Sequence, residues 1–220
     1  MTDVSRETPS TPDLARRAFS SDRLPLVERY VELLATAGVQ RGLIGPREAP
    51  RLWERHVLNC LAVAEAVADD STLADLGSGA GLPGLVLAIG RPDLRVTLVE
   101  PLQRRTIFLD EVVEELGLEQ VRVVRGRAEE LHGVERFDVV TARALAPLSR
   151  LLGWAMPLVA PTGALLAMKG SSAAREIEEA GPVLRRLQCA TPVLEELRAE
   201  DGESTATVVR VAHADPTRIG

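Results

Sequence analysis

The chain has 220 residues, 45% of them hydrophobic, and a formal net charge of −6 at pH 7, which suits one domain with a substantial core and is unusual for a generic nucleic-acid binder. No apolar run reaches the roughly 18 residues of a membrane span, and the amino terminus lacks the apolar core of a secretion signal, so we expect a cytoplasmic protein without a membrane partner. Two distant cysteines without histidine clusters favour neither a disulfide framework nor a zinc site, and we expect no bound metal.

The first 70 residues divide into a tail and a helical cap. Residues 1–21 combine Ser, Thr, Pro and alternating charges without periodicity, which predicts a flexible tail. Apolar residues then recur at helical spacing over 24–37 and, after a glycine-containing loop, over about 50–68. The sequence therefore predicts a small N-terminal helical cap over residues 22–70.

From residue 71 to residue 220, apolar runs alternate with helical patterns. Strands are predicted over 73–76, 94–99, 121–125, 137–142 and 163–168, and helices over 83–90, 102–116, 147–159 and 172–187. Two further extended segments, near 191–197 and 205–212, complete a seven-stranded, mostly parallel sheet flanked by helices. In such doubly wound α/β sheets, ligands bind at the carboxyl ends of the strands.

A glycine-rich turn follows the first predicted strand, in the pattern Asp75-x-Gly77-x-Gly79-x-Gly81. Glycine tolerates positive φ and lets a ligand approach the backbone, so this turn predicts a cofactor cradle. The dinucleotide fingerprint has two residues between its second and third glycines, and the single residue here disfavours NAD. Glu100 directly follows the second predicted strand, where an acid can accept both ribose hydroxyls of an adenosine. The turn and the acid together predict an adenosine-containing cofactor.

These features resemble the class I S-adenosylmethionine-dependent methyltransferases, whose fold is a Rossmann-like α/β sheet. Over about residues 24–212 the chain more specifically resembles the bacterial small-subunit rRNA guanine-N7 methyltransferase family RsmG, also called GidB. The resemblance is carried in chain order by Glu54-Arg55-His56 with Asn59, Leu82-Pro83-Gly84, Arg91-Pro92, Arg127-Ala-Glu-Glu130, Ala142-Arg143-Ala144 and Met168-Lys169-Gly170. It implies S-adenosylmethionine as the cofactor and a guanine of 16S rRNA, near the decoding site of the small ribosomal subunit, as the target.

The resemblance also implies a set of residues for the cofactor cleft. Gly77 and Leu82 would line it, Ala128 and Glu129 would lie along the adenine, and Arg143 would complete the pocket. The pattern of the turn and the second strand adds Gly79 and Glu100 to this set. All these positions follow predicted strands at one end of the sheet. Arg143 lies in an otherwise apolar run, where an arginine needs a partner such as a carboxylate.

Motifs that the chain lacks narrow the expected reaction. The fourth strand is not followed by the Asp/Asn-Pro-Pro-aromatic motif of amino methylation, and neither cysteine lies in a strand-end loop, where a thiolate would serve carbon methylation. Guanine N7 has a free in-plane lone pair, so methyl transfer to it needs alignment rather than a base or a covalent intermediate. Lys169, Arg127 and His56 are the candidate catalytic residues that would orient the guanine and neighbouring phosphates.

The arrangement of cationic residues bears on the partner. Arginines cluster over 41–55 and 122–127, while Lys169 is the only lysine among 26 cationic side chains. Local basic patches of this kind suit a shaped RNA surface, and we expect a monomer that acts on 16S rRNA in the small subunit or an assembly intermediate. A small-molecule methyltransferase of the same fold would share every cofactor residue and is the alternative. A nucleotide-dependent oxidoreductase or a cofactor-binding regulator, which would bind NAD, is a third hypothesis.

Overall fold

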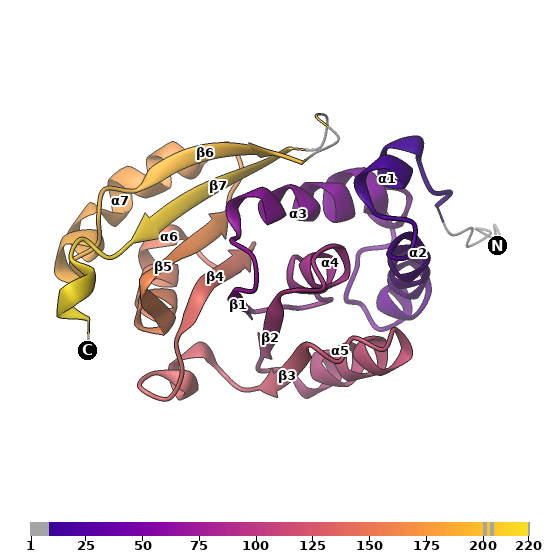
Figure 1. Cartoon of the computed structure of the whole chain (residues 1–220), viewed down its shortest axis with the longest axis horizontal. Coiled ribbons are helices and arrows are strands. Elements are labelled where there is room, and N and C mark those ends of the chain that lie inside the picture. Colours follow the sequence, from indigo (N-terminus) through magenta and orange to yellow (C-terminus); the bar gives the residue numbers. More distant parts are fainter. Residues whose placement is uncertain (1–8, 200–201, 203–204, 220) are drawn as a thin grey trace.

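A seven-stranded sheet organises the chain (Figure 1). The computed structural model describes residues 9–199, 202 and 205–219, and the strands run in the order β3-β2-β1-β4-β5-β7-β6. Strands β1 to β5 pair in parallel, and β7 pairs antiparallel with β5 and β6, which confirms the predicted mostly parallel sheet. The strands are β1 (Thr72–Leu76), β2 (Arg95–Glu100), β3 (Val121–Arg125), β4 (Phe137–Arg143), β5 (Val159–Met168), β6 (Val193–Arg198) and β7 (Thr205–Ala212).

Helices cover both faces of this sheet, as the sequence predicts. One face carries α4 (Gly84–Gly90) and α5 (Gln103–Glu115), and the other carries α6 (Leu148–Ala155) and α7 (Ala173–Arg186) (Figure 1). A 3₁₀ turn over Met156–Leu158 extends α6 to one residue before the predicted end of that helix, where β5 begins. Further 3₁₀ turns lie at Ala128–Leu131 and Pro216–Arg218.

The N-terminal helices lie on the α4 side of the sheet (Figure 1). α2 (Leu24–Leu33) continues as a π-helical turn over Leu34–Gly38. The second predicted helix is one helical segment with varied hydrogen bonding, made of Ala49–Arg51 (3₁₀), Leu52–Leu58 (π), α3 (Asn59–Leu61) and Ala62–Ala66 (3₁₀). The predicted boundary at residue 70 lies in the turn before β1.

The predicted flexible tail over residues 1–21 is wrong for its second half. Residues 13–18 form α1 (Asp13–Ala18), and both Ala15 and Phe19 are buried in the core. Apolar side chains one turn apart give this helix an inner face, and Asp13 in its first turn suits the positive end of the helix dipole. Residues 1–8 lie outside the described residues.

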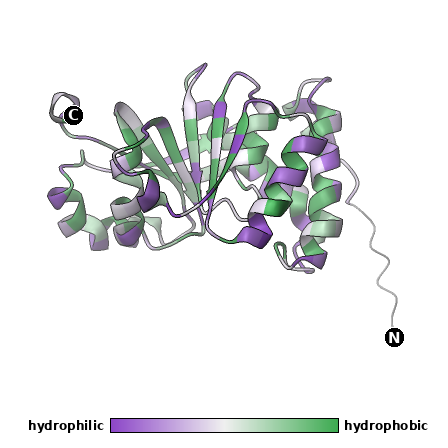
Figure 2. Ribbon diagram, turned by 90° about the horizontal axis from the view of Figure 1, so that it is seen from below, coloured by the Kyte–Doolittle hydropathy of each residue, from purple (hydrophilic) through white to green (hydrophobic). Residues whose placement is uncertain are grey.

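Alternate strand residues face two hydrophobic cores. Leu73, Leu98 and Leu166 pack with α4, α5 and the N-terminal helices, whereas Ala74 and Leu165 pack with α6 and α7. This alternation is the period-two pattern of a sheet that is covered on both sides, and Figure 2 shows hydrophobic residues concentrated along the strands. The N-terminal helices share a core with one face of the sheet, and Tyr30 and His56 of these helices form hydrogen bonds with residues at the carboxyl ends of β1 and β4.

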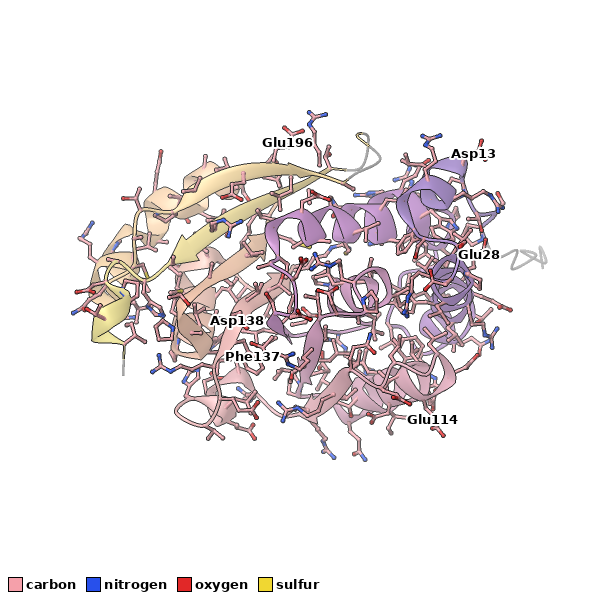
Figure 3. All side chains as sticks on the ribbon, in the orientation of Figure 1. Asp13, Glu28, Glu114, Phe137, Asp138 and Glu196 are labelled. Atoms are coloured by element: carbon pink, nitrogen blue, oxygen red, sulfur yellow. The ribbon has the colours of Figure 1, made fainter. Side chains whose placement is uncertain are left out.

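Most charged side chains lie on the outside of these layers, and Asp75 and Glu100 are the buried exceptions among the described residues. In Figure 3, Asp13, Glu114 and Glu196 project at the rim of the molecule from α1, α5 and β6, and all three are exposed, whereas Phe137 is buried at the start of β4. None of the described helices combines the length and the apolar character needed to cross a membrane.

Candidate functional site

The turn after β1 has the backbone conformation that its glycines allow. Gly77, Gly79 and Gly81 have φ values of +68°, +59° and +98°, in the region that residues other than glycine avoid. A Cβ at Gly77 would lie 2.5 Å from Cδ1 of Leu145, so a side chain there would also force its neighbour to move. This turn therefore depends on glycine for its conformation and for its packing.

Two buried side chains hold this turn from within the core. Oδ2 of Asp75 accepts a hydrogen bond from the backbone N–H of Gly84 at 3.1 Å, and the Tyr30 hydroxyl donates to the Ala80 carbonyl at 2.8 Å. Asp75 is fully buried, and its Oδ1 has no hydrogen-bond partner among the described residues. Burial therefore raises the pKa of Asp75 to about 7.

Glu100 links the turn after β1 to the loop after β2. Its carboxylate is 1% exposed and accepts hydrogen bonds from the backbone N–H groups of Gly79 and Leu102, each at 3.0 Å. Arg105 pairs with the same carboxylate at 3.3 Å. The structure thus places Glu100 beside the glycine turn with protein partners for both oxygens, and its interaction with ribose hydroxyls stays a prediction.

A cavity of about 270 Å³, the smaller cavity below, opens beside the glycine turn at the ends of β1, β2 and β3. Gly77, Ala128 and Glu129 of the predicted cofactor set line it, whereas Gly79, Leu82, Glu100 and Arg143 do not. Its walls are mostly apolar, with a few polar groups among them, as is usual for small-molecule sites. The lining residues are Leu76, Gly77, Val99, Pro101, Gly126, Arg127, Ala128, Glu129, Leu145 and Trp154.

A second cavity, of about 510 Å³ and called the larger cavity below, lies at the ends of β4 and β5. Within the part of the chain that the structure describes, Leu145 alone lines both cavities. It follows Ala144, whose φ of +52° is uncommon for a residue with a side chain and marks a strained turn at the end of β4. The lining residues are Asn59, Arg143, Ala144, Leu145, Ala146, Pro147, Met168, Lys169, Gly170, Glu176 and Thr207.

Lys169 connects two elements of the larger cavity. Its Nζ donates to the Ala146 carbonyl at 2.7 Å and pairs with Oε2 of Glu176 at 2.7 Å. Burial opposes the charge of Glu176, but the bonds from Lys169, Ser172 and the backbone of Leu148 together hold the pKa of this carboxyl below its usual value. The ion pair therefore holds the β4–α6 loop against α7.

Arg143 has the partners that an arginine in an apolar run needs, and they are a histidine, a backbone carbonyl and a thiol rather than a carboxylate. One guanidinium nitrogen lies 2.7 Å from Nδ1 of His56 and 3.1 Å from the Arg55 carbonyl, and the other lies 3.2 Å from Sγ of Cys60. Nε2 of His56 in turn lies 3.0 Å from Oε2 of Glu48. The N-terminal helical segment thus supplies the polar partners that the apolar end of β4 lacks.

The family model described as GidB, rRNA small subunit methyltransferase G, matches residues 23–201. The chain belongs to this family. The similar protein named ribosomal RNA small subunit methyltransferase G in Nocardioides sp. (strain ATCC BAA-499 / JS614) is 69% identical over 217 residues, covering 99% of this chain and 87% of that protein. The protein of the same name in Thermobifida fusca (strain YX) is 55% identical over 202 residues, covering 91% of this chain and 84% of that protein. The predicted family and enzyme class are confirmed.

Solved structures show the same fold. An O-methyltransferase from neocarzinostatin biosynthesis, in complex with S-adenosylmethionine, is similar with a TM-score of 0.58 and 15% identity over 88% of this chain and 61% of that one. The B. subtilis M1A22 tRNA methyltransferase TrmK is similar with a TM-score of 0.52 and 16% identity over 72% of this chain and 66% of that one. The predicted Rossmann-like class I methyltransferase fold is therefore confirmed.

In this member of the methyltransferase G family, the three candidate catalytic residues lie in three different places. Lys169 lines the larger cavity, exposed Arg127 lines the smaller one, and His56 lies behind Arg143 with both ring nitrogens engaged. Some arginines of the two sequence clusters, 41–55 and 122–127, form ion pairs with acidic side chains. Arg41 pairs with Glu111 at 2.7 Å, and Arg122 pairs with Glu135 at 2.5 Å. Among the described residues, no group of three or more His, Cys, Asp or Glu side chains is placed to hold a metal ion.

Sequence reasoning missed three residues of this candidate site. Leu145 separates the two cavities, Glu176 pairs with the lysine, and Trp154 lines the smaller cavity. An acid in the first turn of a helix that follows a strand-end lysine is a signal that would have found Glu176. No local pattern marks Leu145 or Trp154, because their contacts come from the packing of separate elements.

Proposed function

We propose that this chain transfers the methyl group of S-adenosylmethionine to N7 of a guanine in 16S rRNA, near the decoding site of the small ribosomal subunit. We propose that it does so in the cytoplasm and as a monomer. The observation that carries the proposal is the pair of cavities that meet at Leu145. A methyl donor and its acceptor must come together at a shared boundary, and both cavities lie at the carboxyl ends of neighbouring parallel strands.

The residues of the smaller cavity fit the cofactor. Leu76, Val99 and Trp154 give apolar walls suited to a purine ring, and Gly77 leaves its backbone open to a ligand. Ala128 and Glu129 would lie along the adenine. When bound, S-adenosylmethionine supplies an electrophilic methyl group on a sulfonium centre.

The larger cavity suits an acceptor that needs no deprotonation. Its ionisable side chains are a paired lysine and glutamate and a hydrogen-bonded arginine, so none is arranged as a free general base. An ammonium has three N–H donors, and Lys169 uses two of them on Ala146 and Glu176. The third would donate to guanine O6, which leaves the N7 lone pair free to attack.

The decisive experiment supplies the protein with isotopically labelled S-adenosylmethionine and small ribosomal subunits from cells that lack this gene. The rRNA is then digested, and its nucleosides are identified by mass spectrometry. We expect the label to appear in 7-methylguanosine. A parallel reaction with free 16S rRNA shows whether naked RNA or the assembled subunit is the better substrate. Label on another nucleoside would contradict the proposal. Cofactor binding without any labelled RNA would support a small-molecule methyltransferase instead.

A further inference from the structure

We infer that His56 is a positioning residue that holds Arg143 at the transfer site through one fixed ring tautomer, with Glu48 securing that tautomer. The inference rests on the proposed function, because it assigns His56 a role in the methyl transfer. It replaces the expectation that His56 contacts the guanine. His56 thereby connects the N-terminal helices to the end of β4.

The hydrogen-bond chemistry of the three side chains determines the tautomer. A guanidinium can only donate, so Nδ1 of His56 must accept from Arg143 across 2.7 Å and carries no proton. Nε2 then carries the ring proton and donates to Oε2 of Glu48 across 3.0 Å. With its side chain 14% exposed and both nitrogens used, His56 has no ring nitrogen left for a substrate.

The groups around the ring favour its neutral form. Glu48, Arg55 and Arg143 are the charged groups that act on His56. Burial lowers the pKa of His56, and the positive charge of Arg143 lowers it further, against the opposing effect of Glu48. A neutral ring is required by the bond from Arg143, so the electrostatics and the geometry agree.

Arg143 occupies the place where this restraint matters. It is the last residue of β4, it lines the larger cavity, and it is followed by the strained Ala144 and then by Leu145. Its guanidinium also bonds to the Arg55 carbonyl and to Cys60. The N-terminal helical segment thus sets the orientation of Arg143, although His56 precedes Arg143 by 87 residues in the sequence. A loss of the acceptor at Nδ1 removes the shortest of these three bonds and leaves the guanidinium held only by the Arg55 carbonyl and Cys60, so its orientation is less tightly fixed.

Two substitutions distinguish the role of Nδ1 of His56 from the role of Nε2. In His56→Asn the amide oxygen lies near the position of Nδ1 and can accept from Arg143, whereas in His56→Gln the amide nitrogen lies near the position of Nε2 and can donate only to Glu48. We expect His56→Asn to keep kcat within about threefold of the wild type and His56→Gln to lose about tenfold or more, since a hydrogen bond to a charged group is lost. Unfolding of both variants in denaturant shows that the comparison is between folded proteins.

A double-mutant cycle tests whether His56 acts through Arg143. In an Arg143→Gln background we expect the Asn and Gln variants to have equal kcat. The inference is overturned if His56→Gln is as active as His56→Asn, or if their difference persists in that background. Wild-type protein in the same assay keeps this result separate from the proposed function, which fails if the wild type forms no 7-methylguanosine.

A spectroscopic measurement tests the tautomer without any activity. The chain has 3 histidines, so ¹⁵N labelling of the imidazoles and comparison with His56→Asn assign the His56 signals. At neutral pH we expect an unprotonated Nδ1 and a protonated Nε2. A proton on Nδ1, or a doubly protonated ring, would overturn the inference even if the protein methylates rRNA as proposed.

Discussion

At the scale of single residues, the contact between Gly77 and Leu145 connects the two cavities. Gly77 shapes the smaller cavity, and Leu145 forms the wall that the two cavities share. Lys169 also lines the larger cavity, and it bonds to the same β4–α6 loop at Ala146. Both positions therefore control a loop conformation as well as a local contact.

Replacing Gly77 with alanine tests the first contact. The left-handed backbone costs an alanine about 1–2 kcal/mol, and the added Cβ also displaces Leu145. We expect Gly77→Ala to weaken cofactor binding, measured by calorimetry, in addition to lowering stability. Gly117→Ala is the matched control, because its φ of +62° carries the same backbone strain with nothing within 4 Å of the new Cβ. Equal cofactor affinities in the two variants would contradict the expectation.

Replacing Lys169 with alanine tests the second position. The variant loses the bonds to Ala146 and Glu176, so we expect kcat on rRNA to fall about tenfold or more while the cofactor Kd changes less than about threefold. Ser172→Ala serves as the control, because it removes another bond to Glu176 without touching the β4–α6 loop. A large loss of cofactor binding in Lys169→Ala would show that the lysine belongs to the cofactor site.

At the scale of elements, the N-terminal helices brace both loops of the site. α2 reaches the glycine turn through the Tyr30 hydroxyl, and the following helical segment reaches the end of β4 through His56 and Cys60. Because these helices pack in the same core as α4 and α5, movement of the cap would move the walls of both cavities.

Tyr30→Phe tests the first brace. It removes the buried donor to the Ala80 carbonyl, and we expect a loss of about 1 kcal/mol in the free energy of unfolding together with weaker cofactor binding. Thr36→Val is the control, since it removes a hydroxyl that bonds only within the same helical segment, to the Glu32 carbonyl. Denaturant unfolding and calorimetry give the two readouts. Unchanged cofactor affinity in Tyr30→Phe would mean that the brace does not reach the site.

At the scale of the whole molecule, a buried acid makes stability depend on pH. The folded-state pKa of Asp75 is about 7 against an ordinary 3.8, because burial disfavours its charge. Between these values the folded state holds a proton that the unfolded state has released, so this group's contribution to stability falls as pH rises and is fully lost above the folded pKa. The acid that anchors the glycine turn therefore costs the fold stability at neutral pH.

Asp75→Asn removes this dependence while keeping an oxygen that can accept from Gly84. Between pH 3.8 and about 7, we expect the free energy of unfolding of the wild type to fall, relative to that of the variant, by about 1.4 kcal/mol for each unit by which the pH rises. Denaturant titrations at several pH values between about 4 and 8 measure it. Parallel pH profiles for the two proteins would show that Asp75 does not titrate in this range.

Local sequence patterns by themselves determined the sheet, its helices and the position of the glycine turn, because apolar periodicity and glycine placement reflect backbone geometry over a few residues. These patterns did not predict α1, because Ser, Thr and Pro on either side of it obscure the helical spacing of Ala15 and Phe19. Only the tertiary structure decided the partners within the site: His56 on Arg143, Glu176 on Lys169, and Leu145 against Gly77. Such partners come from different elements, and which side chain meets which is decided by how those elements pack around the core.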